Sequence, residues 1–191
     1  SNTLEDFDFG LPGLYAMGSG DAPLVLLEFS DYECTTCAAF HEMVYPKIKS
    51  EYIDTGKLYY VALNHPQPNH ATAQIAAEAA YAAGLQGRFW DMRALLFANS
   101  LYLNAQAIAD LADALDLDRE AFDAVMVRTQ FREQVLAERE CGGRMGVGGT
   151  PSFILATKSG DHALDGTLLE GGLLWSKIDR ELSRRLEQEP P

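Results

Sequence analysis

The pattern of apolar and polar residues predicts two buried strands joined by a helix near the start of the chain. Residues 23–29 form a near-continuous apolar run, which is typical of a strand buried on both faces, and residues 57–63 repeat it. Between these runs, from Cys34 to about Ile53, apolar residues recur every three or four positions. This spacing indicates an amphipathic helix, and Pro46 predicts a kink in it. We therefore expect a strand–helix–strand unit with a right-handed crossover.

The middle of the chain has helical periodicity and no strand pattern. We expect four helices there, because Gly84, the Asn99-Ser100 pair and Asp116 divide the apolar pattern into four stretches. Asn104 and Asp118 have short polar side chains suited to capping the last two of these helices. The predicted helices cover about residues 70–83, 87–98, 104–115 and 118–140.

Strand pattern returns after a glycine-rich joint at 141–149. Residues 152–156 predict a strand, a short strand is expected near 162–164, and a final amphipathic helix is expected over about 173–186. In this order of elements, a helical insertion separates the first strands of the sheet from the last ones. The predicted organisation is an irregular lead-in at 1–15, a sheet domain at 16–66 and 141–191, and a helical insertion at 67–140.

Composition and charge narrow the classes of function. The 191 residues are 47% hydrophobic and 23% charged, which suits a globular chain with a substantial core. The net charge of −13 is spread along the chain, which argues against nucleic acid or an anionic membrane surface as a partner. No apolar run is long enough to span a bilayer, so we expect a soluble chain. The Ser1-Asn2 start resembles the remnant of a cleaved tag, so the sequence leaves export open.

The candidate chemistry lies in two of the three cysteines. Cys34 and Cys37 are spaced C-x-x-C at the point where the first strand gives way to the helix. On a first helical turn the two sulfurs face the same side, and unpaired backbone N–H groups with the helix dipole favour a thiolate. In such a setting the pKa of a cysteine falls from about 8.5 to roughly 3.5–7.5. We expect Cys34 to be the nucleophile and Cys37 the buried resolving thiol.

Other interpretations of this pair stay open. The two cysteines can be packing residues, or they can belong to a metal site with His41 or Cys141, for which a soft ion such as Cu(I) is the best match. A zinc site would need further ligands, because no second cysteine pair is present. A non-catalytic peptide-binding module is a further alternative.

Three segments together resemble the DsbA-like thiol-disulfide oxidoreductases of the thioredoxin superfamily. Residues 17–37 read MGSGDAPLVLLEFSDYECTTC, residues 86–92 read QGRFWDM and residues 147–153 read VGGTPSF. The resemblance covers about residues 16–188. It implies an α/β fold of the thioredoxin-like type, βαβ followed by ββα, with an inserted all-helical subdomain.

The resemblance also implies an activity and a setting. The activity is dithiol–disulfide exchange with cysteine-containing protein substrates, and it requires no cofactor and no metal. A redox partner, which can be membrane-bound, would recycle the pair, and the setting is extracytoplasmic, such as the bacterial periplasm. A disulfide reductase or isomerase is the alternative within the same class of enzyme.

Further site residues follow from the resemblance. Thr150 and Pro151 fall where the superfamily has a cis-proline loop that binds the substrate peptide. Glu28 falls where the family has a glutamate near the buried cysteine, and in an apolar strand its pKa should be raised, so that it helps to move the proton of Cys37. Thr35 and Thr36 replace the Pro-His of strongly oxidising members, so we expect a less oxidising pair.

The histidines and the third cysteine are not assigned a role in the site by their positions in the sequence. His41 is predicted to be a helix-surface residue, and His65, His70 and His162 occupy loop or edge positions that form no constellation. Cys141 is predicted to be an inert or partly buried thiol. The alternatives are that the glycine joint brings it near the active-site face, or that it pairs with another chain.

Overall fold

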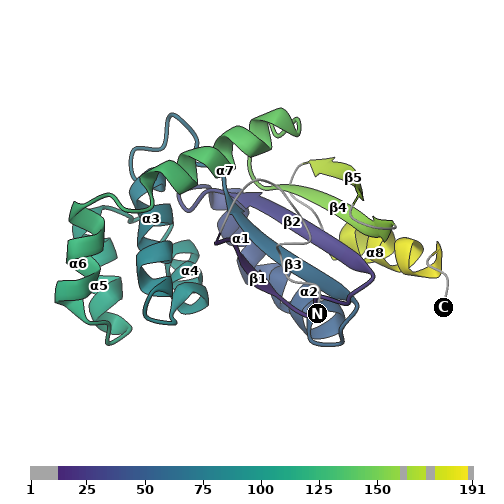
Figure 1. Cartoon of the computed structure of the whole chain (residues 1–191), viewed down its shortest axis with the longest axis horizontal. Coiled ribbons are helices and arrows are strands. Elements are labelled where there is room, and N and C mark those ends of the chain that lie inside the picture. Colours follow the sequence, from purple (N-terminus) through teal and green to yellow (C-terminus); the bar gives the residue numbers. More distant parts are fainter. Residues whose placement is uncertain (1–12, 160–162, 171–174, 189–191) are drawn as a thin grey trace.

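A five-stranded mixed sheet forms the centre of the molecule in this computed structural model, which describes residues 13–159, 163–170 and 175–188 (Figure 1). The strand order is β1-β3-β2-β4-β5, with β2 parallel to β3 and every other pair antiparallel. The predicted strand–helix–strand unit is confirmed by the parallel β2–β3 pair. The short β1 was not predicted. The strands are β1 (Tyr15–Met17), β2 (Leu24–Ser30), β3 (Leu58–Asn64), β4 (Ser152–Ser159) and β5 (Ala163–Glu170).

The crossover between β2 and β3 is divided into separate helical segments, whereas the sequence predicted one kinked helix. It consists of α1 (Thr35–Met43), α2 (Tyr45–Ile48) and a π-helical turn, η2 (Lys49–Ile53). Pro46 lies in the first turn of α2, where the missing N–H of proline removes no helical hydrogen bond. The kink is therefore confirmed, and it takes the form of a new helix start.

Five helices follow β3, where the sequence predicted four. They are α3 (Ala73–Gly84), α4 (Phe89–Ala98), α5 (Ala105–Ala114), α6 (Arg119–Val127) and α7 (Arg132–Arg144). The side chains of Asn104 and Asp118 each accept a backbone N–H at 3.0 Å, so both predicted caps are confirmed. The single helix predicted over 118–140 is wrong, because Thr129 adopts a left-handed φ of 49° and separates α6 from α7. Figure 1 shows α3 to α6 grouped beside one end of the sheet.

Alternate residues of β2 enter two different cores. Leu24 and Leu26 pack in the larger core with α1 and with α8 (Trp175–Gln188), while Val25 and Leu27 pack in a smaller core on the opposite face. This alternation explains why the strand is apolar along nearly its whole length. In the described part of the chain, no helix is long and apolar enough to cross a membrane.

The end of α7 packs directly on the sheet and occupies the start of the predicted glycine joint. A side chain at Gly142 would bring its Cβ to 2.9 Å from both the Phe29 ring and the His65 Nδ1 atom. One turn earlier on α7, the buried Glu138 carboxylate accepts two hydrogen bonds from Asn64, one from the backbone N–H at 2.7 Å and one from the side-chain amide at 2.8 Å. Glycine at 142 therefore permits the close approach of α7 to the ends of β2 and β3.

We expect Gly142→Ala to destabilise the fold by about 1–3 kcal/mol, the usual cost of overpacking a core. Gly143→Ala is the matched control, because it lies in the same helical turn and a Cβ at that position would have no atom within 4 Å. The control should be neutral or stabilising by up to about 1 kcal/mol, since alanine favours helix over glycine. Urea unfolding of the two variants measures the difference, and equal stabilities would contradict the close packing.

Candidate active site at Cys34 and Cys37

The cysteine pair lies at the start of α1, at the carboxyl end of β2. Cys34 is the N-cap residue, with φ −76° and ψ 113°, and its Sγ accepts the backbone N–H of Cys37 at 3.2 Å. Both cysteines are free thiols in this structure. Cys34 keeps 9% of its surface exposed and Cys37 keeps 0%. Within the pair, Cys34 is therefore the sulfur with access to solvent.

The two thiols differ strongly in acidity. Hydrogen bonding from the Cys37 side chain is the largest effect on Cys34, and with the Thr150 side chain and the Cys37 backbone N–H it outweighs burial and lowers the pKa of Cys34 to about 6. Burial, together with the adjacent Cys34, raises the pKa of Cys37 far above that of an ordinary thiol. At neutral pH the arrangement therefore favours a thiolate at Cys34 and a protonated thiol at Cys37.

The loop around Thr150 and Pro151 faces the cysteine pair. The Thr150–Pro151 bond is cis, and the Cys34 Sγ lies 3.4 Å from the Thr150 carbonyl oxygen, to which it donates in its protonated form. Sheet register explains the contact across 116 residues: β4 pairs antiparallel with β2, and Phe29 lies opposite Ser152. The start of β4 therefore lies beside the end of β2, where the cysteine loop begins.

Three further residues singled out in the sequence, Thr35, Thr36 and Cys141, lie beside or away from the cysteine pair and the Thr150–Pro151 loop. The side chains of Thr35 and Thr36 are exposed on the first turn of α1. Cys141 is buried on α7, where its Sγ lies 3.9 Å from the Met145 sulfur and burial raises its pKa. Among the residues that the structure describes, no group of three or more His, Cys, Asp or Glu side chains is placed to hold a metal ion.

Glu28 is buried as expected, but its predicted acidity is wrong. Its carboxylate bonds to the His41 Nε2 atom at 2.7 Å, to Arg93 at 3.1 Å and to the Tyr60 hydroxyl. Burial opposes ionisation, yet the charges of His41 and Arg93 and the hydrogen bonds from His41 and Tyr60 outweigh it and lower the pKa of Glu28 to about 2. Glu28 is therefore an ionised partner of these groups, which is unlike the raised-pKa proton carrier expected for Cys37.

Arg93, which sequence reasoning missed, supplies the compensating charge from α4. Its side chain is only 2% exposed and donates to Glu28, to the Ser30 hydroxyl at 3.1 Å and to the Tyr32 hydroxyl at 3.1 Å. It also donates to Tyr60 at 3.3 Å. One arginine therefore ties the helical insertion to β2 and β3, through groups that lie directly before the cysteine loop.

His41 is not the surface residue that the sequence predicted. Its side chain is 9% exposed, and its ring stacks on Phe97 of α4 with centroids 3.9 Å apart and an interplanar angle of 11°. Burial lowers the pKa of His41, whereas the adjacent Glu28 carboxylate acts to raise it, and the His41 Nε2–H donates to that carboxylate. The helical period placed His41 one turn after Cys37, but only the packing of α4 on α1 covers it.

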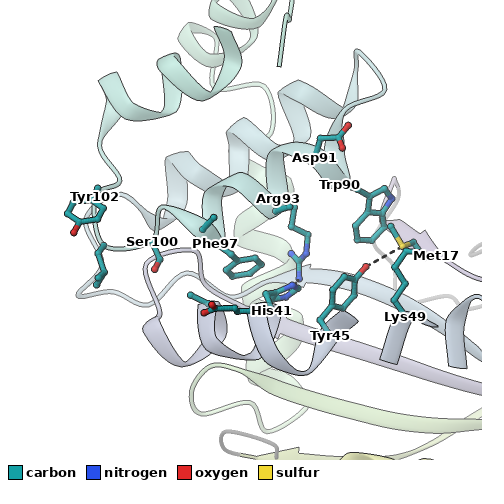
Figure 2. A pocket seen from close by; sticks show the side chains of 15 residues that line it. Met17, His41, Tyr45, Lys49, Trp90, Asp91, Arg93, Phe97, Ser100 and Tyr102 are labelled. Atoms are coloured by element: carbon teal, nitrogen blue, oxygen red, sulfur yellow. Dashed lines mark hydrogen bonds between the residues drawn. The ribbon is translucent and has the colours of Figure 1, made fainter. Parts of the chain in front are cut away.

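A cavity of about 710 Å³ lies between α1, α2 and α4. Aromatic side chains of Tyr45, Trp90 and Phe97 line it, and Figure 2 shows Arg93 extending from α4 toward the His41 ring beside it. Arg93 and His41 therefore form part of the cavity wall, while their contacts to Glu28 lie toward the sheet.

A second buried carboxylate, Asp31, organises the turn before Cys34. Its Oδ2 atom accepts the Gln67 backbone N–H and the His70 Nδ1–H, both at 2.7 Å, and its Oδ1 atom accepts the Glu33 backbone N–H at 2.7 Å. Its carbonyl oxygen accepts the Cys34 backbone N–H at 3.1 Å. The expectation that His70 belongs to no constellation is therefore wrong. No local pattern links His70 to Asp31, because 39 residues separate them.

Breaking one side of the buried Glu28–Arg93 pair should be strongly destabilising. We expect Arg93→Met or Glu28→Gln alone to cost about 3–5 kcal/mol, since each leaves a buried charge uncompensated. The double variant should cost clearly less than the sum, and urea unfolding of the four proteins measures the coupling. Additive costs would show that the two side chains act independently.

The same pair predicts a pH dependence. A carboxyl group whose pKa is lower in the folded than in the unfolded chain stabilises the fold at pH values above its unfolded-state pKa. For Glu28 this stabilisation is lost as the pH falls from about 4.5 toward about 2. Glu28→Gln should therefore lose less stability than the wild type over that range, as followed by unfolding at several pH values. A parallel loss in both proteins would contradict the ionised state of Glu28.

Comparisons with known proteins agree with this geometry. A family model described as Thioredoxin matches residues 12–167. "Disulfide bond formation protein D" of Bacillus subtilis is 25% identical over 156 residues, which cover 78% of this chain and 70% of that protein. Wolbachia pipientis alpha-DsbA1 superposes with a TM-score of 0.81 at 21% identity and covers 93% of each chain, so the match includes the inserted helices.

A third relative is much longer than this chain. "Na(+)/H(+) antiporter NhaA 1" of Salinispora arenicola is 29% identical over 182 residues, which cover 91% of this chain and 27% of the antiporter. The chain thus spans about a quarter of the length of that relative. The family match, by contrast, extends over most of the chain and includes both cysteines, Thr150 and Pro151. The chain therefore belongs to the thioredoxin family, with the DsbA-like arrangement of a helical subdomain inserted into the sheet domain.

Proposed function

We propose that this chain is a thiol-disulfide oxidoreductase that exchanges disulfides with cysteines of protein substrates. The observation that carries the proposal is the placement of Cys34 as the N-cap of α1, where its Sγ accepts the Cys37 N–H at 3.2 Å and lies 3.4 Å from the Thr150 carbonyl oxygen. A sulfur in this position has a pKa of about 6 and is ionised at neutral pH. A thiolate is the nucleophile in disulfide exchange and also a good leaving group.

In the oxidising direction, a substrate thiolate attacks the Cys34 sulfur of the Cys34–Cys37 disulfide. A bond forms between the substrate and Cys34, the Cys34–Cys37 bond breaks, and its electron pair leaves on Cys37, which then takes up a proton. A second substrate thiolate attacks the substrate sulfur of this mixed disulfide and releases Cys34 as a thiolate. Two electrons pass to the protein, and the substrate gains a disulfide.

The acidities of the two cysteines suit these roles. Cys34 leaves readily in the second step because its thiolate is stabilised, whereas burial keeps Cys37 protonated once it is released. In the reverse direction the Cys34 thiolate attacks a substrate disulfide, and Cys37 must lose its proton before it resolves the intermediate. The name of the Bacillus subtilis relative favours the oxidising direction for this chain as well.

Thr150 and Pro151 are proposed to bind the substrate beside the reacting sulfur. The Thr150 carbonyl is a backbone group of this loop in contact with the Cys34 sulfur, and proline at 151 has no N–H of its own to donate. An extended substrate segment can therefore pair with this loop edge through backbone hydrogen bonds, while its cysteine lies against Cys34.

The proposed setting is extracytoplasmic, such as the bacterial periplasm, where protein disulfides form and persist. Turnover in the oxidising direction then requires a partner that accepts two electrons from the reduced pair and regenerates the Cys34–Cys37 disulfide. A reductase or isomerase is the alternative within the same chemistry. The reduction potential distinguishes them: we expect a value between about −120 mV and about −270 mV, less oxidising than the strongest oxidases because Thr36 carries no positive charge.

We expect the thiolate absorbance of the reduced protein to rise with a midpoint near pH 6, which is the pKa of Cys34. Free cysteine ionises at about 8.5, so the shift is easily resolved. Cys34→Ser should abolish the step near pH 6, and Cys37→Ser should retain a thiolate that ionises below 8.5. A midpoint at or above 8.5 in the wild type would contradict the assignment of Cys34 as nucleophile.

We expect Cys37→Ser to accumulate a mixed disulfide with a disulfide-bonded protein substrate: the Cys34 thiolate attacks the substrate disulfide and releases one substrate thiolate, and the thiol that would resolve the intermediate is missing. Mass spectrometry of the trapped complex should identify Cys34 as the linked residue. Cys141→Ser in the same background is the control and should leave trapping unchanged, since Cys141 is buried on α7. Trapping through Cys37 in Cys34→Ser, with none through Cys34, would reverse the two roles.

A further inference from the structure

We propose that His70, held by Asp31, is the cation that stabilises the Cys34 thiolate in place of the histidine that the Thr35-Thr36 dipeptide lacks. The inference deepens the proposed function and rests on it. His70 is a positioning and tuning residue in this proposal, because it acts through charge and does not contact the substrate.

The first support is geometric. The His70 Nδ1–H donates to the Asp31 carboxylate at 2.7 Å, and the Asp31 carbonyl accepts the Cys34 backbone N–H at 3.1 Å. The Asp31 side chain is 0% exposed and also accepts the Gln67 N–H, which fixes the loop that carries His70. The imidazole is thereby anchored beside the turn that leads into the nucleophile.

The second support is electrostatic. The hydrogen bond to Asp31 is the largest effect on His70 and raises its pKa, and the negative charges of Asp31, Glu33 and a Cys34 thiolate raise it further. All three of these charged groups belong to the loop between β2 and α1. Because coupling between two titrating sites is reciprocal, a thiolate that favours the imidazolium is itself favoured by it.

The third support is the charge of Asp31 itself. The buried Asp31 carboxylate acts to raise the pKa of Cys34, since two negative charges repel. A protonated His70 bonded to that carboxylate offsets the repulsion. The His70 side chain is 27% exposed, so it exchanges protons with solvent freely and responds to pH.

The test is His70→Gln, which keeps a donor for Asp31 and removes the titrating charge. We expect the pKa of Cys34 to rise in this variant. At pH 7 the equilibrium constant for forming the Cys34–Cys37 disulfide from glutathione disulfide should increase about threefold, which is the scale of the interaction in a partly exposed charge pair. His70→Lys should restore most of the wild-type value. Lys49→Gln, which removes a like charge from an exposed position on η2, is the control and should leave both quantities unchanged.

The pH profile separates this role from a merely structural one. The difference between wild type and His70→Gln should be largest between about pH 6 and the raised pKa of His70, where the thiolate and the imidazolium coexist. It should vanish at lower pH, where Cys34 is protonated, and at higher pH, where His70 is neutral. A difference that is constant with pH, or no difference at pH 7, would overturn the inference.

The two proposals fail in distinguishable ways. If wild-type protein does not exchange disulfides with glutathione or protein substrates, the proposed function fails, whereas the Cys34 titration still reports on His70. If the wild type exchanges disulfides and His70→Gln titrates identically to it, only the role of His70 is wrong.

Discussion

The ion pair between Glu28 and Arg93 is the interaction on which the arrangement of this molecule depends. A carboxylate in the middle of a buried strand is costly unless a positive charge and hydrogen-bond donors meet it there. The strand itself supplies neither, and Arg93 comes from α4, 65 residues later. The helical subdomain therefore contributes to the stability of the sheet directly and fixes its own position against α1 by the same contact.

Two other buried carboxylates, those of Asp31 and Glu138, also join separate segments of the chain, near the C-terminal ends of β2 and β3. Asp31 joins the cysteine loop to the segment after β3, and Glu138 joins α7 to the last residue of β3, Asn64. Each accepts backbone N–H groups at or just beyond the ends of these strands. These hydrogen bonds hold the loop from which α1 starts, and Cys34 is the N-cap residue of that helix. A nucleophile held in this way has little freedom to move away from the N–H group that stabilises its thiolate.

The acidity of a buried group depends on what is packed against it more than on the element that carries it. Glu28 in an apolar strand was expected to have a raised pKa, and the pKa is lowered because Arg93, His41 and Tyr60 converge on the carboxylate. The pKa of Cys34 follows the prediction, because its main stabilising groups lie within the same helical turn. Local groups are visible in the spacing of residues, and distant groups are not.

The sequence by itself determined the strand–helix–strand unit, the caps at Asn104 and Asp118, and the cysteine pair at a helix start, because each is visible in the local periodicity or spacing of residues. The resemblance added the Thr150–Pro151 loop. Only the tertiary structure decided that Arg93 pairs with Glu28, that His41 is covered and that His70 bonds to Asp31. These contacts join segments 13 to 65 residues apart, and they arise from the packing of α4 and the loop after β3, which hydrophobic periodicity does not specify.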